Sequence, residues 1–520
     1  MASRGKQKTP AFNPKQGLGS LDMLNLNSLV VMATTLVSAT ATYPAPQIFA
    51  QQRQDHFAGD NANVWGQFFY VNDTFWKGAS SNAPIFLCVG GEGPAFDGSV
   101  VVDSVHCSNA AQWLEENGAL MVALQHRYYG CHAAANGNGL VDCPIDAFTH
   151  DANEDLKYHS SHQALSDVAN FHQFIVEKYA LTAQNKWISF GGSYPGMLAA
   201  WTRLKFPHLI HAAVSSSAPV HAKLEMQEYN NIAADAYSVE MVGGSINCTH
   251  AIAQGHAMIG SLLKTKEGRT QLTTDFVTGE DPEWLADPTN ARGFAGEGVA
   301  YFPSQGNDPM STAPFSNIAL ICKTMVDPSL GDEVKRLSLV TQGQRAAAGV
   351  AGVAGVAGVA GANTHMEMIA PWLKRARFQD GPGWDLWSWQ TCNEFGFYQT
   401  CDIGSRCMYT QGLDLLVDEM AFCETDYKIA TATVQANINQ TNLYYGSDTP
   451  VGSRVLWVNG QVDPWHGLSV NTALPGMPIL YVKGASHHAW THPLSDCSQQ
   501  TVLDARAAIR KQVTAWLGEE

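Results

Sequence analysis

One short segment constrains the fold of this chain more than any other. An apolar run ending at Phe190 leads into Gly-Gly-Ser-Tyr-Pro-Gly at residues 191–196, and helix-like sequence follows over residues 197–204. The pattern predicts a buried strand, a sharp turn and a helix, with the hydroxyl of Ser193 presented at the edge of a sheet. Backbone N–H groups at the start of that helix would face an oxyanion formed beside the serine. The segment predicts a nucleophile; the alternative is an ordinary glycine-rich turn.

Two further strand ends supply an acid and then a histidine, in the order that an α/β-hydrolase site requires. A buried strand is predicted shortly before Asp463, and another over residues 478–482, before His487 and His488. Both side chains would lie at the carboxyl edge of the sheet, where α/β proteins build their sites. Taken singly, the aspartate could be a turn former and the histidine a loop residue. Together with Ser193 they predict a Ser-Asp-His triad, with His488 as the rival base.

These segments resemble the three catalytic blocks of the family that contains lysosomal Pro-X carboxypeptidase, dipeptidyl peptidase II and thymus-specific serine protease. Three further stretches are similar to blocks of that family: residues 51–57 (QQRQDHF), 125–130 (QHRYYG) and 389–396 (WQTCNEFG). The resemblance runs from about residue 48 to the C-terminus, and the loop over residues 90–94 is closest to the thymus-specific branch. It implies an α/β-hydrolase, a doubly wound α/β sheet with an inserted, mainly helical cap domain.

The residue types suggest a mechanism for the predicted triad. His487 would take the proton of Ser193, and Asp463 would hold the imidazole in the required tautomer. The backbone N–H of Tyr194 would donate to the oxyanion, joined by one from the loop that contains Gly91. The family's matching position favours the first histidine of the pair as the base.

The resemblance also implies contacts with a substrate. Met197 and Trp465 would line an apolar pocket for the residue before the cleaved bond, often proline in this family; both could equally be core residues. Glu92 would serve the substrate amine or, the favoured interpretation, brace its own loop. The implied activity is that of a serine exopeptidase acting on short peptides, as a carboxypeptidase or a dipeptidyl aminopeptidase. An esterase or lipase, and a non-catalytic binding protein with a hydrolase fold, stay open.

The length of 520 residues is too great for one compact core and predicts a catalytic domain with a second element. The expected organisation is a signal peptide over residues 1–41, a first hydrolase part over 42–225, a cap over 226–430 with a low-complexity loop over 346–362, and a second hydrolase part over 431–520. Basic residues before a short apolar run characterise the leader, so we expect a secreted, lysosomal or vacuolar protein. The cap would narrow access to Ser193; the alternative is a mere surface insertion.

Composition excludes several partner classes. The net charge of −16 argues against nucleic acid and against an anionic membrane surface. No downstream run reaches the ~18 apolar residues of a membrane-spanning helix, so we expect no stable membrane insertion. No paired C-x-x-C or H-E-x-x-H spacing occurs, so we expect neither a metal nor another cofactor. Whether the chain forms a homodimer stays open.

Cysteines and sequons fit a secretory route. Eleven cysteines in such a chain predict disulfides, with at least one thiol left over, and the cluster Cys392, Cys401, Cys407 and Cys423 predicts several bridges in that region. Sequons at Asn72, Asn247 and Asn439 are candidate glycosylation sites.

Overall fold

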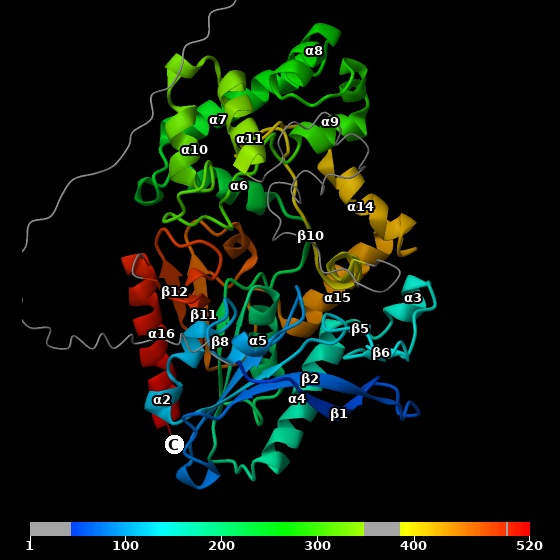
Figure 1. The fold of residues 1–520 in the computed structure, drawn as a ribbon, viewed down its shortest axis with the longest axis vertical. Helices are drawn as coiled ribbons and strands as arrows, with labels where there is room; N and C mark the ends of the chain where they lie inside the picture. Colours follow the sequence, from blue (N-terminus) through cyan, green and yellow to red (C-terminus); the bar gives the residue numbers. More distant parts are fainter. Residues whose placement is uncertain (1–42, 348–384, 496–497, 520) are drawn as a thin grey trace, which may run out of the picture. The chain divides into compact units, whose positions relative to one another are not determined.

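A sheet of eight strands is the frame of the computed structural model, which describes residues 43–347, 385–495 and 498–519, without the side chains of residues 418 and 419 (Figure 1). The strands are β1 (Gln47–Arg53), β2 (Val64–Asn72), β3 (Ile85–Val89), β4 (Leu120–Leu124), β7 (Trp187–Gly192), β8 (Ala212–Ser216), β11 (Val455–Gly460) and β12 (Ile479–Val482). Their order is β1-β2-β4-β3-β7-β8-β11-β12. The β1–β2 and β2–β4 pairs are antiparallel, and all other neighbours are parallel.

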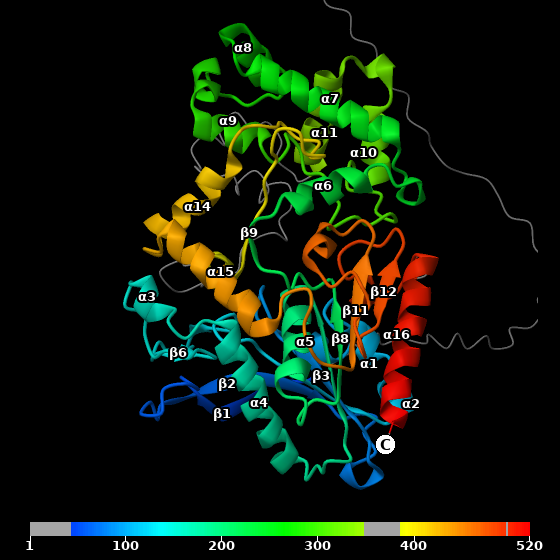
Figure 2. The ribbon, with the colours of Figure 1, turned by 180° about the vertical axis from the view of Figure 1, so that it is seen from behind.

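Alternation along the strands sends side chains into two separate cores. In β3, Ile85, Leu87 and Val89 belong to one apolar cluster, whereas Phe86 and Cys88 belong to another. Helices α4 (Ser161–Lys178) and α5 (Tyr194–Lys205) cover the first face, and α16 (Gln500–Gly518) covers the second, beside β8 and β12 (Figures 1 and 2). Burial on both faces explains the continuous apolar runs of the parallel strands. The doubly wound α/β-hydrolase fold is therefore confirmed.

Helix α4 has the apolar spacing of an amphipathic helix. Leu165, Val168, Phe171 and Ile175 recur three or four residues apart and are all buried in the first core. The Ser160 hydroxyl accepts a hydrogen bond from the backbone N–H of Gln163 and so caps the first turn. Packing of this one apolar stripe fixes the helix against the sheet.

The chain between β8 and β11 is mainly helical in its described part. Its helices are α6 (Gln227–Ala236), α7 (Ile246–Leu262), α8 (Lys266–Asp275), α9 (Pro288–Ala295), α10 (Ile318–Met325), α11 (Glu333–Ala347), α13 (Leu386–Gln390), α14 (Leu415–Thr425) and α15 (Thr431–Tyr445). Short strands β9 (Lys223–Glu225) and β10 (Gly396–Tyr398) pair in parallel. The predicted leader over residues 1–41, and the low-complexity loop from residue 348 on, lie outside the described residues.

Core membership divides this inserted chain into two parts. Residues of α7, α10 and α11, such as Ile252, Ile321 and Leu337, form a third apolar cluster together with residues 401–415. In contrast, residues of α13 and α15, including Trp389 and Tyr445, belong to the first core of the sheet. Helices α7, α10 and α11 therefore pack in a cluster apart from the two cores of the sheet, which Val462 joins from the segment after β11, whereas α13 and α15 share the first core of the sheet.

The remaining short elements lie in the first hydrolase part: α1 (Ser108–Ala111), α2 (Leu114–Asn117), α3 (Ala152–Asp155), β5 (His132–Ala133) and β6 (Leu140–Val141). Within the described ranges, five disulfides join Cys88–Cys107, Cys131–Cys143, Cys248–Cys322, Cys392–Cys423 and Cys401–Cys407. The bridges predicted among the four clustered cysteines are thus confirmed, and the eleventh cysteine, Cys497, lies outside the described residues. Within the described ranges, no helix combines the length and apolarity that crossing a membrane requires.

Residues from two of the sequence blocks, 51–57 and 125–130, bind the buried carboxylate of Asp167 in α4. Arg127 donates from Nε to Oδ2 of Asp167 at 2.7 Å and from Nη2 to Oδ1 at 2.5 Å. His56 Nε2 lies 2.8 Å from the same Oδ1. Burial alone would raise the pKa of Asp167, but Arg127 and His56 outweigh it and hold that pKa below its ordinary value. This cluster ties the segment after β1 and the end of β4 to α4.

Asp167→Asn should lower the free energy of unfolding by about 3–5 kcal/mol, because Arg127 would keep a buried charge without its counter-ion. Chemical denaturation of the two proteins measures the difference. Glu154→Gln is the matched control, since Glu154 pairs with Lys157 on the surface and should change stability by less than about 1 kcal/mol. Equal losses in both variants would contradict the assignment.

Candidate active site

Ser193 lies at a forced turn between β7 and α5. Its φ of 64° and ψ of −133° fall in a sparsely populated region, which costs a non-glycine residue on the order of 1–3 kcal/mol. The turn is held by its neighbours: a Cβ on Gly191 would come within 2.2 Å of the Pro195 carbonyl oxygen, and one on Gly196 within 2.7 Å of the Ser216 carbonyl oxygen. The Ser193 backbone N–H donates to Ser216 at 2.9 Å. The strand-turn-helix prediction is confirmed.

Asp463 and His487 meet beyond the ends of two neighbouring parallel strands, β11 and β12. Asp463 is fully buried; its Oδ1 accepts from the Trp465 backbone N–H at 3.0 Å, and its Oδ2 lies 2.9 Å from His487 Nδ1. An ionised carboxylate can only accept, so Nδ1 carries the proton and Nε2 is left as an acceptor. That Nε2 is buried and has no hydrogen-bond partner among the described residues. This is the geometry of a base oriented by an acid.

His488 has different surroundings from His487. Its backbone N–H donates to Ser217 Oγ at 2.8 Å, and its Nδ1 lies 3.0 Å from Thr491 Oγ1. The ring lies against the turn, because a Cβ on Gly192 would come within 2.8 Å of its Cγ. Burial, together with the neighbouring histidines, lowers the pKa of His488 well below its ordinary value. His487, and not His488, contacts Asp463.

The two predicted oxyanion donors lie on facing segments. Tyr194 is the first residue of α5, where N–H groups lack helical partners. The loop after β3 presses on the same turn, since a Cβ on Gly91 would come within 2.3 Å of Pro195 Cγ. No backbone carbonyl in the described part of the chain accepts from either N–H. The Tyr194 N–H instead donates to the Glu92 carboxyl group, so an oxyanion formed beside Ser193 would compete with that carboxyl group for it.

Glu92 brings a carboxyl group to this position. Burial raises its pKa to about 7, and its own backbone N–H, the Ser193 hydroxyl, His487 and the Tyr194 N–H oppose that rise less strongly. Its Oε2 is buried without a hydrogen-bond partner among the described residues. The side chain therefore faces the predicted nucleophile, a contact that the sequence alone did not reveal.

Trp465 forms one wall of an aromatic group near the histidine. Its ring centroid lies 5.3 Å from that of Tyr229 and 5.6 Å from that of Phe397, both edge to face, and 6.4 Å from that of His487. Trp465 is only partly buried. Sequence reasoning missed Tyr229 and Phe397, because they belong to α6 and β10, far from the triad blocks and outside any recognisable motif.

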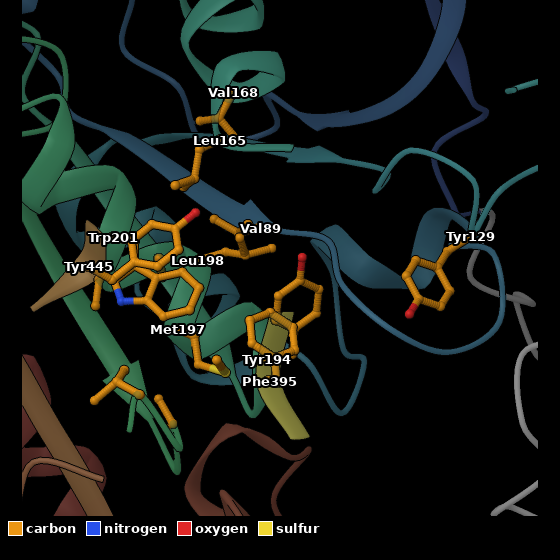
Figure 3. Packing of buried hydrophobic residues seen from close by; sticks show 14 of the residues in the cluster. Val89, Tyr129, Leu165, Val168, Tyr194, Met197, Leu198, Trp201, Phe395 and Tyr445 are labelled. Carbon is orange, nitrogen blue, oxygen red and sulfur yellow. The ribbon is translucent and has the colours of Figure 1, made fainter. Parts of the chain in front are cut away.

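Met197 and residues 389–396 pack around the turn at Ser193 and the start of α5 and support them. Met197 has no exposed surface and lies in the first core with Tyr194 and Phe395 (Figure 3). Gln390 donates from Nε2 to the Tyr194 hydroxyl at 2.9 Å and accepts from the Tyr129 hydroxyl at 2.8 Å. Phe395 packs against Tyr194 at 5.5 Å between ring centroids. This block holds α5 from the side of the inserted chain.

The candidate glycosylation sites differ in exposure. Asn247 and Asn439 lie on exposed positions of α7 and α15. Asn72 is half-buried at the end of β2, and its Nδ2 donates to the Val101 carbonyl at 2.9 Å. In the described ranges, no group of three or more histidine, cysteine, aspartate or glutamate side chains is arranged to hold a metal ion.

Comparisons with known proteins agree with these features. Residues 52–509 match the sequence profile described as serine carboxypeptidase S28. Thymus-specific serine protease of Homo sapiens is 32% identical over 473 residues, which cover 90% of this chain and 86% of that protein. Its Mus musculus counterpart is 31% identical over 480 residues, covering 91% and 87%. Lysosomal Pro-X carboxypeptidase of Homo sapiens is 23% identical over 521 residues, covering 98% and 94%.

Glu92→Gln should change how stability depends on pH. Below about pH 4.5 the carboxyl holds its proton in the folded and the unfolded chain, so the substitution has little effect. Between about pH 4.5 and 7 only the unfolded chain releases the proton, and the stability of the natural protein falls as pH rises. Above pH 7 the variant should be the more stable, by a difference on the order of 3 kcal/mol or less.

Urea denaturation of both proteins below pH 4.5 and above pH 7 measures this difference. Glu154→Gln, at an exposed glutamate, is the control and should show no such separation. The assignment of a buried, protonated Glu92 would be contradicted if the natural protein and Glu92→Gln differed in unfolding free energy by the same amount at both ends of this pH range.

Proposed function

Because the chain belongs to the serine carboxypeptidase S28 family and is therefore a serine-type peptidase, we propose that Ser193, Asp463 and His487 are its catalytic triad. The observation that carries the proposal is the Asp463–His487 hydrogen bond of 2.9 Å, which leaves the second imidazole nitrogen unpaired. The forced turn at Ser193 supports it further, because it follows β7, a parallel strand of the same sheet that is separated from β11 by β8 alone. His488 lacks the contact with Asp463 and is not the base.

The reaction proceeds in two halves. Ser193 Oγ attacks the peptide carbonyl carbon while His487 Nε2 takes the hydroxyl proton, and the imidazolium then gives that proton to the leaving amine as the C–N bond breaks. Water attacks the resulting acyl-enzyme by the same proton transfers, which frees the acid product and the serine. Asp463 stabilises the imidazolium in both halves. The N–H groups of Tyr194 and Gly91 donate to the oxyanion of each tetrahedral intermediate.

The substrates are short peptides with proline or a small apolar residue before the cleaved bond. The partly exposed ring of Trp465, set between Tyr229 and Phe397, offers the flat apolar surface that a pyrrolidine ring fits. One relative carries the name lysosomal Pro-X carboxypeptidase, which fits this preference. Glu92 braces the loop after β3 or serves a substrate amine, depending on which terminus the enzyme trims.

The route through the cell is the secretory one. Five disulfides in the described residues support folding in an oxidising compartment. Exposed sequons at Asn247 and Asn439 would accept glycans, and Asn72 less readily, because its amide is already engaged. We propose a secreted, lysosomal or vacuolar enzyme.

Ser193→Ala should reduce turnover of a proline-containing peptide by on the order of a thousandfold or more, as expected for a triad nucleophile. Mass spectrometry of the products identifies the cleaved bond and which end of the peptide is shortened. Labelling by a fluorophosphonate should vanish in this variant and persist in Ser80→Ala, a control at an exposed serine. Activity retained in pure Ser193→Ala protein, or a preference for acyl esters over peptides, would refute the proposal.

The two adjacent histidines should differ sharply on substitution. His487→Ala should abolish turnover, because no other imidazole contacts Asp463 among the described residues. His488→Ala should retain much of it, since that ring is bonded to Thr491 instead. Steady-state kinetics on one peptide tests both, and the reverse order of losses would move the base to His488.

Trp465→Ala should reduce kcat/KM for peptides with proline before the cleaved bond by about 10- to 200-fold, and reduce it less for poor substrates. Trp465→Phe, which keeps a flat ring, should lose less. Competition between peptides that differ only at that residue gives the ratios directly. Equal cleavage after charged residues and after proline by the unmutated enzyme would show that the pocket has been assigned wrongly.

A further inference from the structure

Gln305 joins the inserted chain to both triad-bearing loops. It lies between α9 and α10, in the part of the insertion that forms the third apolar cluster. Its backbone carbonyl accepts from the His487 backbone N–H at 3.1 Å, and the preceding residue, Ser304, donates from Oγ to the Val462 carbonyl at 2.5 Å. One short loop therefore contacts two segments: Val462, which precedes Asp463, and His487.

The side chain of Gln305 is oriented by two donors. Trp465 Nε1 and the Tyr229 hydroxyl each lie 2.9 Å from Oε1. An indole N–H can only donate, so the atom facing Trp465 must be the amide oxygen and not the nitrogen. Both acceptor positions of that oxygen are then used, and the amide plane is fixed. The –NH₂ group must point away from Trp465 and Tyr229.

The –NH₂ group of Gln305 has no partner in the described part of the chain. No acceptor for Gln305 Nε2 occurs among the residues that the structure describes, and the side chain is only partly buried. Two N–H donors are thus presented at the rim of the Trp465 wall, next to the histidine loop. A bound peptide brings a row of backbone carbonyls past this position, and a carbonyl is the acceptor that an amide N–H pairs with.

We propose that Gln305 is a positioning and specificity-determining residue, which fixes Trp465 relative to His487 and donates to the carbonyl that precedes the residue in the Trp465 pocket. The inference rests on the proposed peptidase function and adds a second recognition point to it. It makes the enzyme selective for substrates with at least one peptide bond before the pocket residue. A substrate without that preceding peptide bond would form no hydrogen bond with the Gln305 side chain.

The test pairs two substrates with two forms of the enzyme. One substrate is a dipeptidyl anilide with proline before the cleaved bond, and the other is its analogue with an alkene in place of the amide before proline. The natural enzyme should lose about 3- to 10-fold in kcat/KM on the analogue, the size of one neutral hydrogen bond. Gln305→Glu keeps the acceptor for Trp465 and Tyr229 but loses both donors. Its kcat/KM on the amide substrate should be lower than that of the natural enzyme. Its kcat/KM on the alkene analogue should be no lower than on the amide substrate.

Two readouts separate recognition from a structural defect. Gln305→Met loses both roles, so its Ser193 labelling rate by fluorophosphonate should fall, whereas that of Gln305→Glu at its own pH optimum should stay closer to the natural rate. The inference would be overturned if the natural enzyme had equal kcat/KM for the two substrates. It would also be overturned if Gln305→Glu lost as much kcat/KM on the alkene analogue as the natural enzyme does. Either result would leave the proposed function standing. Absence of both Ser193 labelling and turnover of either substrate in the natural enzyme would overturn both.

Discussion

Three segments meet at the end of β7 more closely than added side chains would allow, and the geometry of the site depends on this contact. The strand end at Gly191 lies against the Pro195 backbone in the first turn of α5, and the loop at Gly91 lies against the Pro195 ring. The approach costs backbone strain at Ser193, which the surrounding hydrogen bonds and the two cores offset. Rigidity of this kind would keep the proposed nucleophile, Ser193, and the proposed oxyanion donors in a fixed relation before any substrate arrives.

The inserted chain supports the site in two ways that differ physically. Its later part, with Trp389 and Tyr445, shares the core of the sheet and braces α5 through Gln390 and Phe395. Its earlier part packs in the third cluster, which also contains Val462 before Asp463, and it hydrogen-bonds to the same region around Gln305. The first kind of support braces α5, and the second braces the segments that carry Asp463 and His487.

The sheet and the strand ends that carry the proposed triad could be predicted from the sequence because each signal is local. Ser193, Asp463 and His487 all follow buried apolar strands, and parallel strands bring their carboxyl ends to one edge whatever lies between them. Gln305 and Tyr229 could not be found this way, since their roles come from contacts about 76–182 residues away along the chain, in segments without a motif. Complete burial of Met197 and the raised pKa of Glu92 likewise depend on packing that only the folded chain supplies.

The apolar cluster of α7, α10 and α11 has a consequence for local unfolding. Its helices are joined by the Cys248–Cys322 bridge, and the cluster also contains Val462, the residue before Asp463. If these helices opened as one cooperative unit, Val462 would lose its apolar neighbours, and the hydrogen bond between Gln305 and the His487 backbone would break. Local unfolding in the inserted chain would therefore act directly on the two segments that carry Asp463 and His487.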